Sequence, residues 1–292
     1  MASSQLLGGT FTFKGTGKTV YRFGYGAMHL VGHNAWGEPE NRQEAVAVVR
    51  EAISLGINHI DTSDYYGPHI ANQIIKEAVF PYTKDLVIVT KVGARRGADQ
   101  SWLTAISEEE LILAVEQNLL NLGLESLDIV NLRVGLPMGT DETSIDKPLK
   151  VLVKLKEQGL IKNIGLSNIS YKQYKESESI SDIVSVQNHY NLAYRKDDLL
   201  IDELAAKGIA FVPFFPLGGF MPIQSEILER IAASIGESPK KVALAWLLQR
   251  SENILLISGT SSVKHLRENI LAGSLELSAE ALFELDKIGT TV

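Results

Sequence analysis

Short apolar runs alternate with longer amphipathic stretches along this chain. Residues 86–91 (LVIVTK) and residues 127–132 (LDIVNL) are nearly continuous apolar runs, a pattern typical of parallel strands that are buried on both faces. In contrast, Val46, Val49 and Ile53 recur at the spacing of one helix face, which predicts an amphipathic helix. The chain is therefore predicted to alternate strands with helices.

Eight strands are predicted after an N-terminal hairpin, and a helical segment follows each of them. The hairpin pairs residues 10–13 with residues 19–22, because Gly15 and Gly17 supply a turn between two β-rich runs. The eight strands are predicted at residues 23–27, 59–61, 86–91, 127–132, 161–165, 183–187, 209–214 and 254–257. Helices are predicted at residues 41–56, 70–80, 107–121, 144–158, 171–178, 197–207, 238–250, 262–272 and 279–288.

Capping residues mark the predicted starts of two of these helices. Asn41 precedes Glu44 by three residues, and Ser107 precedes Glu110 by three residues. In a capping box of this kind the first side chain accepts a hydrogen bond from the backbone of the second residue, whose side chain bonds back in return. We therefore expect both pairs to form capping boxes.

Strand–helix units in this order predict one large domain. A (β/α)8 barrel needs eight such units over about 250 residues, and no proline-rich or charged linker divides the chain. We therefore predict an α/β fold, a (β/α)8 TIM barrel spanning residues 1–292, with the N-terminal β-hairpin and a C-terminal extra helix. The alternative is a doubly wound open sheet, but Gly24 and Gly26 of the first strand lack the third glycine of its fingerprint.

The composition narrows the class of protein. Of the 292 residues, 45% are hydrophobic and 22% are charged, and the net charge is −7. This balance excludes an intrinsically disordered chain, and nothing in it favours nucleic acid as a partner. The chain has no cysteine, which excludes disulfides, thiolate metal sites and cysteine nucleophiles.

Neither a membrane span nor a secretory signal is visible in the sequence. No apolar run reaches the ~18 residues that a transmembrane helix needs, and the first residues (MASSQ) lack a basic stretch followed by an apolar one. A cytoplasmic protein without a membrane partner is therefore expected. His29 and His33 are four residues apart but flank Gly32 in a predicted loop, so no metal site is predicted.

Charged side chains directly follow three of the predicted strands. Asp61, Lys91 and Arg133 each come at the end of an apolar strand run. In a (β/α)8 barrel the carboxyl ends of the strands and the loops after them carry the active site. A charged side chain buried there must be paired, because burying a lone charge is costly. The sequence therefore predicts a network of one carboxylate and two cations at the mouth of the barrel.

The motifs at the strand ends resemble those of the aldo-keto reductases over essentially the whole chain. They are Asp61-Thr-Ser-x-x-Tyr66-Gly67, Thr90-Lys91, Gly165-x-Ser167-Asn168, Gln187-x-x-Tyr190-Asn191 and Gly259-Thr260-Ser261. Within that family the chain is most similar to the bacterial pyridoxal reductase branch. The resemblance implies a (β/α)8 barrel and NADPH-dependent reduction of a small aldehyde to an alcohol, here pyridoxal to pyridoxine.

Carbonyl reduction by hydride needs a group that gives a proton to the developing alkoxide. A tyrosine phenol has an ordinary pKa of ~10, and a neighbouring cation lowers that pKa because it favours the phenolate. We expect Lys91 to supply the cation and Asp61 to hold Lys91 in place. Tyr66 is then the general acid, and the resemblance implies the same roles for these three residues.

Arg133 departs from the family pattern, since most aldo-keto reductases carry histidine at this position, five residues after Asp128. An arginine cannot relay protons, because it does not lose its own. It can donate hydrogen bonds to a carbonyl oxygen and stabilise negative charge there. We expect Arg133 to anchor the substrate oxygen and to help lower the pKa of Tyr66. The alternative is that Arg133 only pairs with an acid.

The resemblance also implies which residues hold NADPH. Ser167, Asn168 and Gln187 correspond to ligands of the nicotinamide carboxamide, and Phe214 corresponds to an aromatic ring that stacks on the nicotinamide. Further contacts are implied for Gly26, Ala27, Met28 and Asp61, for a pyrophosphate loop (Phe215, Leu217, Gly218 and Gly219) and for an adenosine end (Gly259, Thr260, Ser261, Ser262, Lys264, His265, Glu268 and Asn269). Hydroxyls, a lysine and helix N-terminal amides suit a 2′-phosphate, which favours NADPH over NADH.

Aromatic side chains in the predicted loops are candidates for the substrate pocket. Trp36 lies in the loop after the first strand, and Trp102 lies in the loop after the third. Both are suited to wall a pocket for a flat ring. His189, which follows the sixth strand, is a third candidate for a substrate contact.

Two other functions remain open at the level of the sequence, because a fold does not fix a function. One is a reductase for another small carbonyl or sugar. The other is a cofactor-binding regulatory subunit, similar to the potassium-channel β subunits that share this fold. The intact set of Asp61, Tyr66 and Lys91 favours an enzyme.

Overall fold

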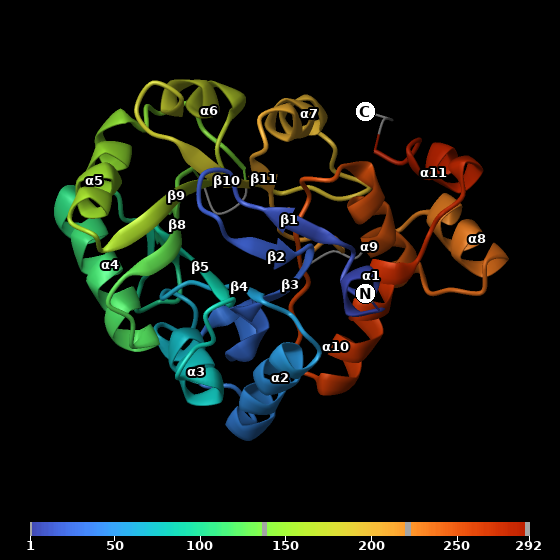
Figure 1. Ribbon diagram of the computed structural model, residues 1–292, viewed down its shortest axis with the longest axis horizontal. Coiled ribbons are helices and arrows are strands. Elements are labelled where there is room, and N and C mark those ends of the chain that lie inside the picture. Colours follow the sequence, from blue (N-terminus) through green and yellow to red (C-terminus); the bar gives the residue numbers. More distant parts are fainter. Residues whose placement is uncertain (1, 136–138, 220–222, 290–292) are drawn as a thin grey trace.

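Eight parallel strands pair in chain order in the computed structural model, which describes residues 2–135, 139–219 and 223–289 (Figure 1). They are β3 (Phe23–Gly26), β4 (His59–Asp61), β5 (Val87–Val92), β8 (Leu127–Arg133), β9 (Ile161–Ser167), β10 (Ile183–Gln187), β11 (Ala210–Phe211) and β12 (Leu256–Ile257). Strand β12 pairs with β3. The remaining gap closes where the Phe211 amide donates to the Asn253 carbonyl, and the Leu255 amide to the Phe211 carbonyl, both at 2.9 Å. The predicted (β/α)8 barrel is confirmed.

Helices form a ring around this barrel, as the view down its axis shows (Figure 1). The helices that follow the strands are α2 (Arg42–Ser54), α3 (Ile70–Val79), α4 (Glu108–Leu122), α5 (Asp146–Glu157), α6 (Tyr171–Ser177), α7 (Asp198–Ala206), α9 (Pro239–Arg250) and α10 (Val263–Ile270). The C-terminal extra helix is α11 (Ala279–Leu285), and the N-terminal hairpin consists of β1 (Thr10–Thr12) and β2 (Thr19–Tyr21). No helix within the described ranges is long and apolar enough to cross a membrane.

Several elements were not predicted from the sequence. They are α1 (Ala2–Leu6), the hairpin of β6 (Ala94–Arg96) and β7 (Trp102–Thr104), α8 (Glu226–Ser234), and the 3-10 helices η1 (Ala27–Leu30), η2 (His33–Ala35) and η3 (Leu271–Ser274). Helix α8 did have a signal: the Ser225 side chain accepts a hydrogen bond from the Leu228 amide, and Leu228, Ile231 and Ala232 form a buried face. Residues 220–222, which follow the predicted pyrophosphate loop, lie outside the described residues.

The predicted helix caps are largely confirmed. Ser107 and Glu110 form both hydrogen bonds of a capping box at the start of α4. Asn41 accepts a hydrogen bond from the Glu44 amide at 3.1 Å, so it caps α2 as expected. The described part of the chain shows no hydrogen bond between the Glu44 side chain and the Asn41 amide. The capping box predicted for Asn41 and Glu44 is therefore wrong.

Alternation along the strands decides which side chains face the interior of the barrel. Val87 and Val89 of β5 join a small buried cluster with Ile129 of β8, whereas Ile88 belongs to the larger apolar cluster that includes residues of the surrounding helices. Since successive side chains of a strand point to opposite faces, Lys91 continues the inward row of Val87 and Val89. The charge of Lys91 is thereby placed inside the barrel, at the carboxyl end of β5.

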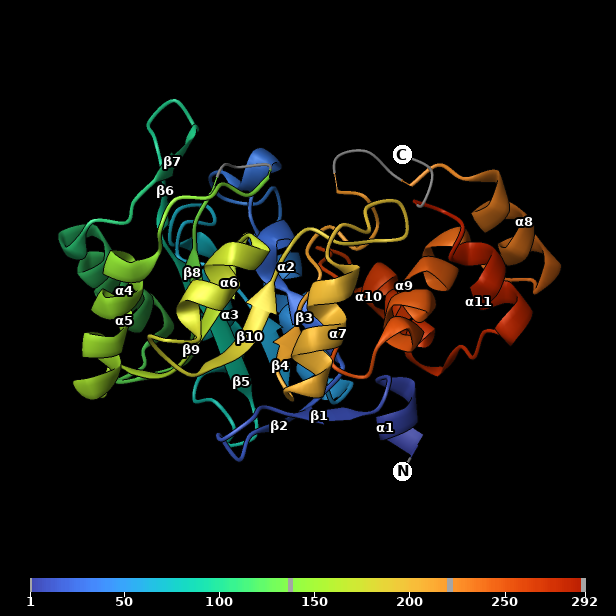
Figure 2. The same cartoon turned by 90° about the horizontal axis from the view of Figure 1, so that it is seen from above.

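The N-terminal hairpin lies across the other end of the barrel (Figure 2). Phe13 is fully buried in the interior cluster with Val87, Val89 and Ile129. Phe11, which is only partly buried, meets the Phe13 ring edge-on at 5.7 Å. The hairpin therefore closes the amino end of the barrel with apolar side chains. The charge of Lys91 lies at the opposite, carboxyl end.

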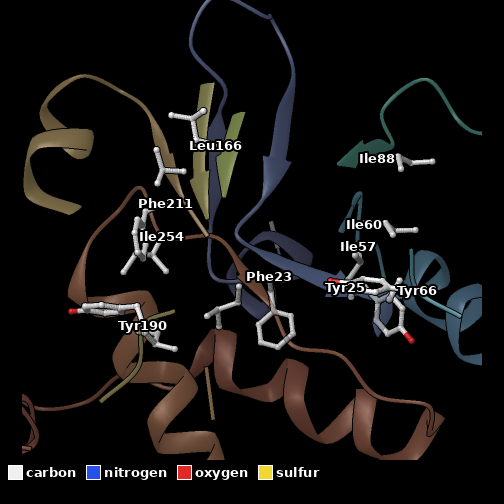
Figure 3. Packing of buried hydrophobic residues seen from close by; sticks show 14 of the residues in the cluster. Phe23, Tyr25, Ile57, Ile60, Tyr66, Ile88, Leu166, Tyr190, Phe211 and Ile254 are labelled. Carbon is white, nitrogen blue, oxygen red and sulfur yellow. The ribbon is translucent and has the colours of Figure 1, made fainter. Parts of the chain in front are cut away.

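The seam of the barrel is held by packing more than by regular strand pairing. The strands predicted at 209–214 and 254–257 pair regularly only over Ala210–Phe211 and Leu256–Ile257, and a single bridge joins Phe211 to Ile254. The two side chains lie next to each other in Figure 3, and the ring of Tyr190 meets the ring of Phe211 edge-on at 5.6 Å.

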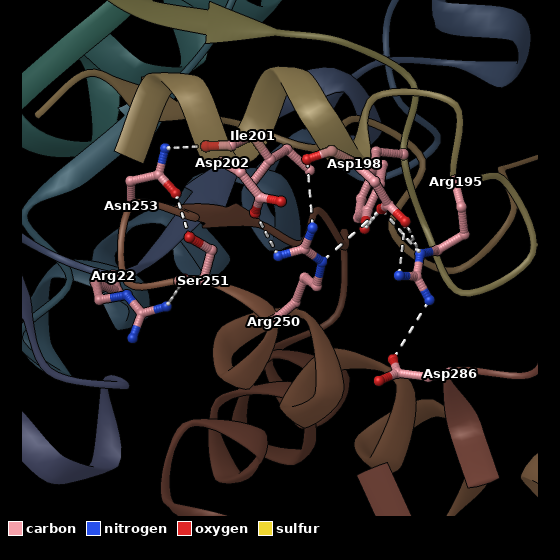
Figure 4. Close-up of polar contacts among 10 residues, drawn as sticks. Arg22, Arg195, Asp198, Ile201, Asp202, Arg250, Ser251, Asn253 and Asp286 are labelled. Atoms are coloured by element: carbon pink, nitrogen blue, oxygen red, sulfur yellow. Dashed lines mark hydrogen bonds and ion pairs between the residues drawn. The ribbon is translucent and has the colours of Figure 1, made fainter. Parts of the chain in front are cut away.

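Ion pairs between partly buried arginines and partly or fully exposed carboxylates connect the helices over this seam (Figure 4). Arg250 at the end of α9 donates to Asp202 of α7 at 2.8 Å. Arg195 pairs with Asp198 of α7 at 2.7 Å and with Asp286, just after α11, at 3.3 Å. The guanidinium groups thus bridge α7, α9 and α11 where few backbone hydrogen bonds cross the sheet.

Replacing Phe13 with alanine is expected to destabilise the fold by about 3–5 kcal/mol, the usual effect of removing a fully buried phenylalanine. Urea unfolding followed by circular dichroism measures this. Phe11→Ala is the matched control, since Phe11 of β1 contacts the Phe13 ring and keeps solvent contact; it should lower the midpoint much less. Equal effects of the two changes would mean that the hairpin does not seal the barrel.

Candidate active site

A cavity of about 770 Å³ opens at the carboxyl end of the strands. Its walls come from almost every strand end and from the loops between them. The lining residues are Gly26, Met28, His29, Asp61, Tyr65, Tyr66, Lys91, Trp102, Arg133, Ser167, Gln187, Phe214, Phe215, Pro216, Leu217, Gly219, Ile223, Leu228, Ser238, Pro239, Lys240, Ala243, Ile257, Ser258 and Gly259. All four residues predicted to be catalytic are among them.

The predicted ion pair lies at the floor of the cavity. Lys91 Nζ donates to Asp61 Oδ1 at 2.5 Å and to the backbone carbonyl of Thr62 at 3.0 Å, and both charged side chains are almost fully buried. The second carboxylate oxygen of Asp61 accepts a hydrogen bond from Gln187 Nε2 at 3.0 Å. Each buried charge thus has direct partners, as a charge removed from water requires.

Tyr66 lies beside this pair, with Lys91 Nζ 5.4 Å from the centroid of its ring. Burial raises the pKa of Tyr66, and the charge of Asp61 raises it further, whereas Arg133 acts to lower it. The pKa of Tyr66 is therefore above its ordinary value, contrary to the expected lowering, because burial and the charge of Asp61 outweigh the effect of Arg133. The phenol stays protonated at neutral pH, which is the state a proton donor needs.

Arg133 ends β8 and lines the same cavity. Its guanidinium carbon lies 5.8 Å from the centroid of the Phe214 ring. The charge of Arg133 lowers the pKa values of both Tyr65 and Tyr66, so the expected direction of its effect on Tyr66 is confirmed. A guanidinium group can donate hydrogen bonds to an oxygen that enters the cavity.

Two buried polar atoms on the cavity wall lack a hydrogen-bond partner among the described residues. They are Ser167 Oγ and Gln187 Oε1. Asp61 holds the amide nitrogen of Gln187, which leaves the oxygen Oε1 as an acceptor, and the hydroxyl of Ser167 can donate. Since buried polar groups are normally paired, this donor and acceptor fit a ligand with a primary amide group.

Asn168 is placed differently from its predicted role. Its amide nitrogen donates to the backbone carbonyls of Val134 at 2.8 Å and of Gly139 at 2.7 Å, and the residue does not line the cavity. Asn168 has a positive φ of 59°, a backbone conformation that asparagine tolerates. The side chain therefore ties the loop after β8 to the end of β9.

The glycines near the floor make room in the cavity. A Cβ on Gly26 would lie 2.4 Å from the carbonyl oxygen of Ile257, and a Cβ on Gly259 would lie 2.5 Å from the carbonyl oxygen of Gly26. No side chain fits at either position, so the backbones of β3 and of the segment after β12 form a flat wall. Met28 also lines this wall, whereas Ala27 is buried behind it.

The predicted pyrophosphate loop lines the cavity on the side of Phe214. Phe215, Leu217 and Gly219 contribute to the wall, and Gly218 lies between them at a φ of 96°. A Cβ on Gly219 would lie 2.6 Å from the ring of Phe215. Position 219 therefore has no room for a side chain, because the Phe215 ring packs against it.

The residues assigned to the adenosine end lie mostly beyond the lining of the cavity. Gly259 lines it, and the side chain of Ser262 caps α10 by accepting a hydrogen bond from the His265 amide. Asn269 donates to Ser258 Oγ at 3.2 Å, which joins α10 to the cavity wall. Of the others in this group, Thr260 and Ser261 precede α10, Lys264 lies in its first turn and Glu268 in its second half, and the side chain of Lys264 is 81% exposed.

Only one of the three predicted substrate residues lines the cavity. Trp102 does so and meets the ring of Tyr65 edge-on at 5.6 Å. Trp36 lies behind it, and the guanidinium of Arg96 lies 4.0 Å from the ring of Trp102 and 5.3 Å from the ring of Trp36. Trp36 therefore braces the wall, because the β6–β7 hairpin places Arg96 between the two rings.

His189 also lies behind the wall. Its imidazole stacks on Tyr194 at 4.2 Å and on Phe214 at 5.7 Å. Burial lowers the pKa of His189, so the ring is neutral at physiological pH. His189 thus supports Phe214 from behind, within a column of rings that ends at the cavity.

Sequence reasoning missed part of the cavity wall. Ser238, Pro239 and Lys240 at the start of α9 line it, as do Leu228 of α8 and Tyr65 beside Tyr66. The sequence predicts a helix from residue 238, but the approach of its first residues to the cavity depends on how α9 packs over the barrel. Tyr65 could have been found, since it shares the motif of Tyr66.

Within the described ranges, no group of three or more His, Cys, Asp or Glu side chains could hold a metal ion. The arrangement instead combines a protonated phenol, a guanidinium donor and a buried ion pair beside an amide-binding corner. Such a set can bind a carbonyl oxygen and give it a proton.

Comparisons with known proteins point to one family. The chain matches the description "Aldo/keto reductase family" over residues 22–290. It is 60% identical over 281 residues to the pyridoxine 4-dehydrogenase of Escherichia coli K12, an alignment that covers 96% of this chain and 98% of that protein. It is 35% identical over 271 residues to an uncharacterized oxidoreductase of Schizosaccharomyces pombe, covering 92% and 87%.

Solved structures share the fold. A thermostable aldo-keto reductase determined with the inhibitor epalrestat is 28% identical, with a TM-score of 0.82 over 96% of this chain and 99% of that chain. An aldo-keto reductase of Klebsiella pneumoniae determined with NADPH is 23% identical, with a TM-score of 0.77 over 95% and 94%. At 23% identity, the similarity to the Klebsiella pneumoniae structure shows only a shared fold.

Proposed function

Because this chain belongs to the aldo/keto reductase family, we propose that it reduces pyridoxal to pyridoxine with NADPH as the hydride donor. The observation that carries this proposal is the protonated Tyr66 beside the buried Asp61–Lys91 pair, at the floor of a cavity that also presents Arg133. The 60% identity to a pyridoxine 4-dehydrogenase supports the choice of substrate. We place the reaction in the cytoplasm, in keeping with the sequence.

We assign the cofactor to the part of the cavity with unpaired polar atoms. Ser167 and Gln187 would hold the nicotinamide carboxamide, because Ser167 Oγ can donate to its oxygen and Gln187 Oε1 can accept from its nitrogen. Phe214 would lie against the nicotinamide ring, supported by His189 from behind. NADPH supplies a hydride when it is bound. The loop at 215–219 and the start of α10, with Lys264, would hold its phosphates.

The proton in this reaction comes from Tyr66. The aldehyde carbon receives the hydride, the electron pair of the carbonyl bond moves to the oxygen, and that oxygen takes the proton of the phenol. The resulting phenolate regains a proton from solvent. Arg133 stabilises the negative charge as it develops on the oxygen, and Lys91 is held in place by Asp61 to stabilise the phenolate.

Arg133 also suits this aldehyde in particular. Pyridoxal carries a hydroxyl on the ring carbon next to the one that bears the aldehyde, so two oxygens lie side by side in one plane. A guanidinium presents two parallel donors to such a pair, which a histidine does not. The aromatic wall of Tyr65 and Trp102 suits a flat ring, which favours pyridoxal over a sugar.

A regulatory subunit without turnover is the alternative function. The complete set of Asp61, Lys91 and Tyr66, each buried and in contact or close to its neighbour, favours an enzyme. Arginine in place of the usual histidine is the one feature that weakens this view. Turnover itself decides between the two functions.

Tyr66→Phe is expected to lower pyridoxal reduction at least about 100-fold, the usual loss when a general acid is removed. The measurement is the fall in NADPH absorbance on addition of pyridoxal, with cofactor affinity followed by fluorescence quenching. The affinity should stay within about twofold, because the substitution removes only the hydroxyl. Wild-type protein that binds NADPH but reduces no aldehyde would favour the regulatory subunit instead.

Arg133→His is expected to remove a preference for aldehydes with a neighbouring hydroxyl. Wild-type protein should reduce 2-hydroxybenzaldehyde with a kcat/KM about tenfold above that of benzaldehyde, and the variant should reduce the two with similar efficiency. Arg133→Lys is the control, since it keeps the charge without the planar fork, and it should behave like the histidine variant. A preference that survives in both variants would assign the selectivity to another residue.

A further inference from the structure

Asp64 lies in the same loop as Tyr66 but faces away from the cavity. Tyr66 lines the cavity, whereas the partners of Asp64 lie on α3 and α4 outside the barrel. The side chain of Asp64 is 7% exposed, and its carboxylate accepts three hydrogen bonds. They come from Asn72 Nδ2 at 3.0 Å, Asn121 Nδ2 at 2.9 Å and His69 Nδ1 at 2.6 Å.

The contacts of Asp64 continue into a wider buried network. Asn72 Oδ1 accepts a hydrogen bond from Thr62 at 2.8 Å, and Asn72 Nδ2 also donates to Asn118 Oδ1 at 3.0 Å. The same oxygen of Asn118 accepts from Thr90 of β5 at 2.5 Å. Thr62 follows Asp61 at the end of β4, and Thr90 precedes Lys91 in β5. The network therefore joins the outer faces of these two strand ends to α3 and α4.

His69 is the member of this group with an unusual backbone. It has a φ of 70° immediately before α3 begins at Ile70, a conformation that side chains with a Cβ rarely adopt. Two contacts with Asp64 hold it there: the His69 amide donates to the Asp64 carbonyl at 2.7 Å, and the imidazole donates to the carboxylate. This hydrogen bond raises the pKa of His69.

The two contacts close a short loop that carries Tyr66 between its ends. The Tyr66 amide donates to the carbonyl of Ser63, just before this loop, at 3.1 Å, and the amide of Ala71 in α3, just after it, donates to the Tyr66 carbonyl at 3.2 Å. The backbone of Tyr66 is thus held from both sides. A disfavoured backbone conformation that its surroundings enforce is a feature found at active sites, where it fixes geometry in advance.

We propose that His69, acting through Asp64, is a positioning residue that holds the phenol of Tyr66 at the reacting oxygen. This role rests on the proposed function, in which Tyr66 is the proton donor. His69 itself does not line the cavity, so it acts only through the loop. Losing the hydrogen bond between His69 and Asp64 would slow the chemical step, because small displacements of a catalytic group reduce rate strongly. Substrate and cofactor contacts would stay in place.

The test separates the hydrogen bond from the backbone conformation. His69→Gly removes the imidazole but accepts the positive φ without strain, so the melting temperature should fall only by the small amount that the lost hydrogen bond accounts for. We expect kcat for pyridoxal to drop about tenfold, with KM and the NADPH dissociation constant within about twofold. His69→Asn tolerates the same backbone and can donate its amide to Asp64, so it should recover most of the rate.

Gln73→Ala is the matched control on the same helix. Gln73 donates to Asn121 at 3.3 Å but does not contact Asp64, and this variant should keep the wild-type kcat. Wild-type rates in His69→Gly, or a rate loss that follows a lowered melting temperature and is not recovered by asparagine, would overturn the positioning role. If the wild-type protein reduces no aldehyde at all, the proposed function fails and the positioning role fails with it.

Discussion

The buried pair of Asp61 and Lys91 is the interaction on which the rest of the site depends. Two charges inside a barrel are stable only if each keeps its partners. Lys91 donates to Asp61 and to the Thr62 carbonyl, and Asp61 accepts in addition from Gln187. This requirement fixes side chains from β4, β5 and β10 relative to one another. It also leaves Gln187 Oε1 as an acceptor beside Ser167, where we propose that the carboxamide of the nicotinamide binds.

The barrel gives this pair its surroundings. Alternation along β5 places Lys91 above two inward valines, and the hairpin closes the barrel below them with Phe13. Both charges therefore face the cavity at the carboxyl end of the barrel. The same burial keeps Tyr66 protonated, because burial and the charge of Asp61 outweigh the influence of Arg133 on its pKa. A proton donor that stays neutral until the substrate oxygen becomes negative is suited to the reductive direction.

The sequence predicted what strand alternation and motif order determine. The barrel, its hairpin and the meeting of Asp61, Lys91 and Arg133 at one mouth follow from which residues end the strands, and the structure confirms them. The positions of Trp36, His189 and Asn168 depend on long loops and on stacking between them, which no local pattern encodes. The start of α9 reaches the cavity only because that helix packs over the seam. The sequence could not predict that the pKa of Tyr66 is raised, because this shift comes mainly from burial, which is a property of the folded molecule.

A double-mutant cycle on Asp61 and Lys91 tests the central claim most directly. Lys91→Met should lower the free energy of unfolding by about 3–5 kcal/mol, because it leaves the carboxylate buried without its cation. Adding Asp61→Asn should recover most of that stability, while pyridoxal reduction stays lost in the single and the double variants. That result would show that the pair is kept for the reaction. Near-normal reduction by the stable double variant would contradict the account, since the catalytic floor would then work without its charges.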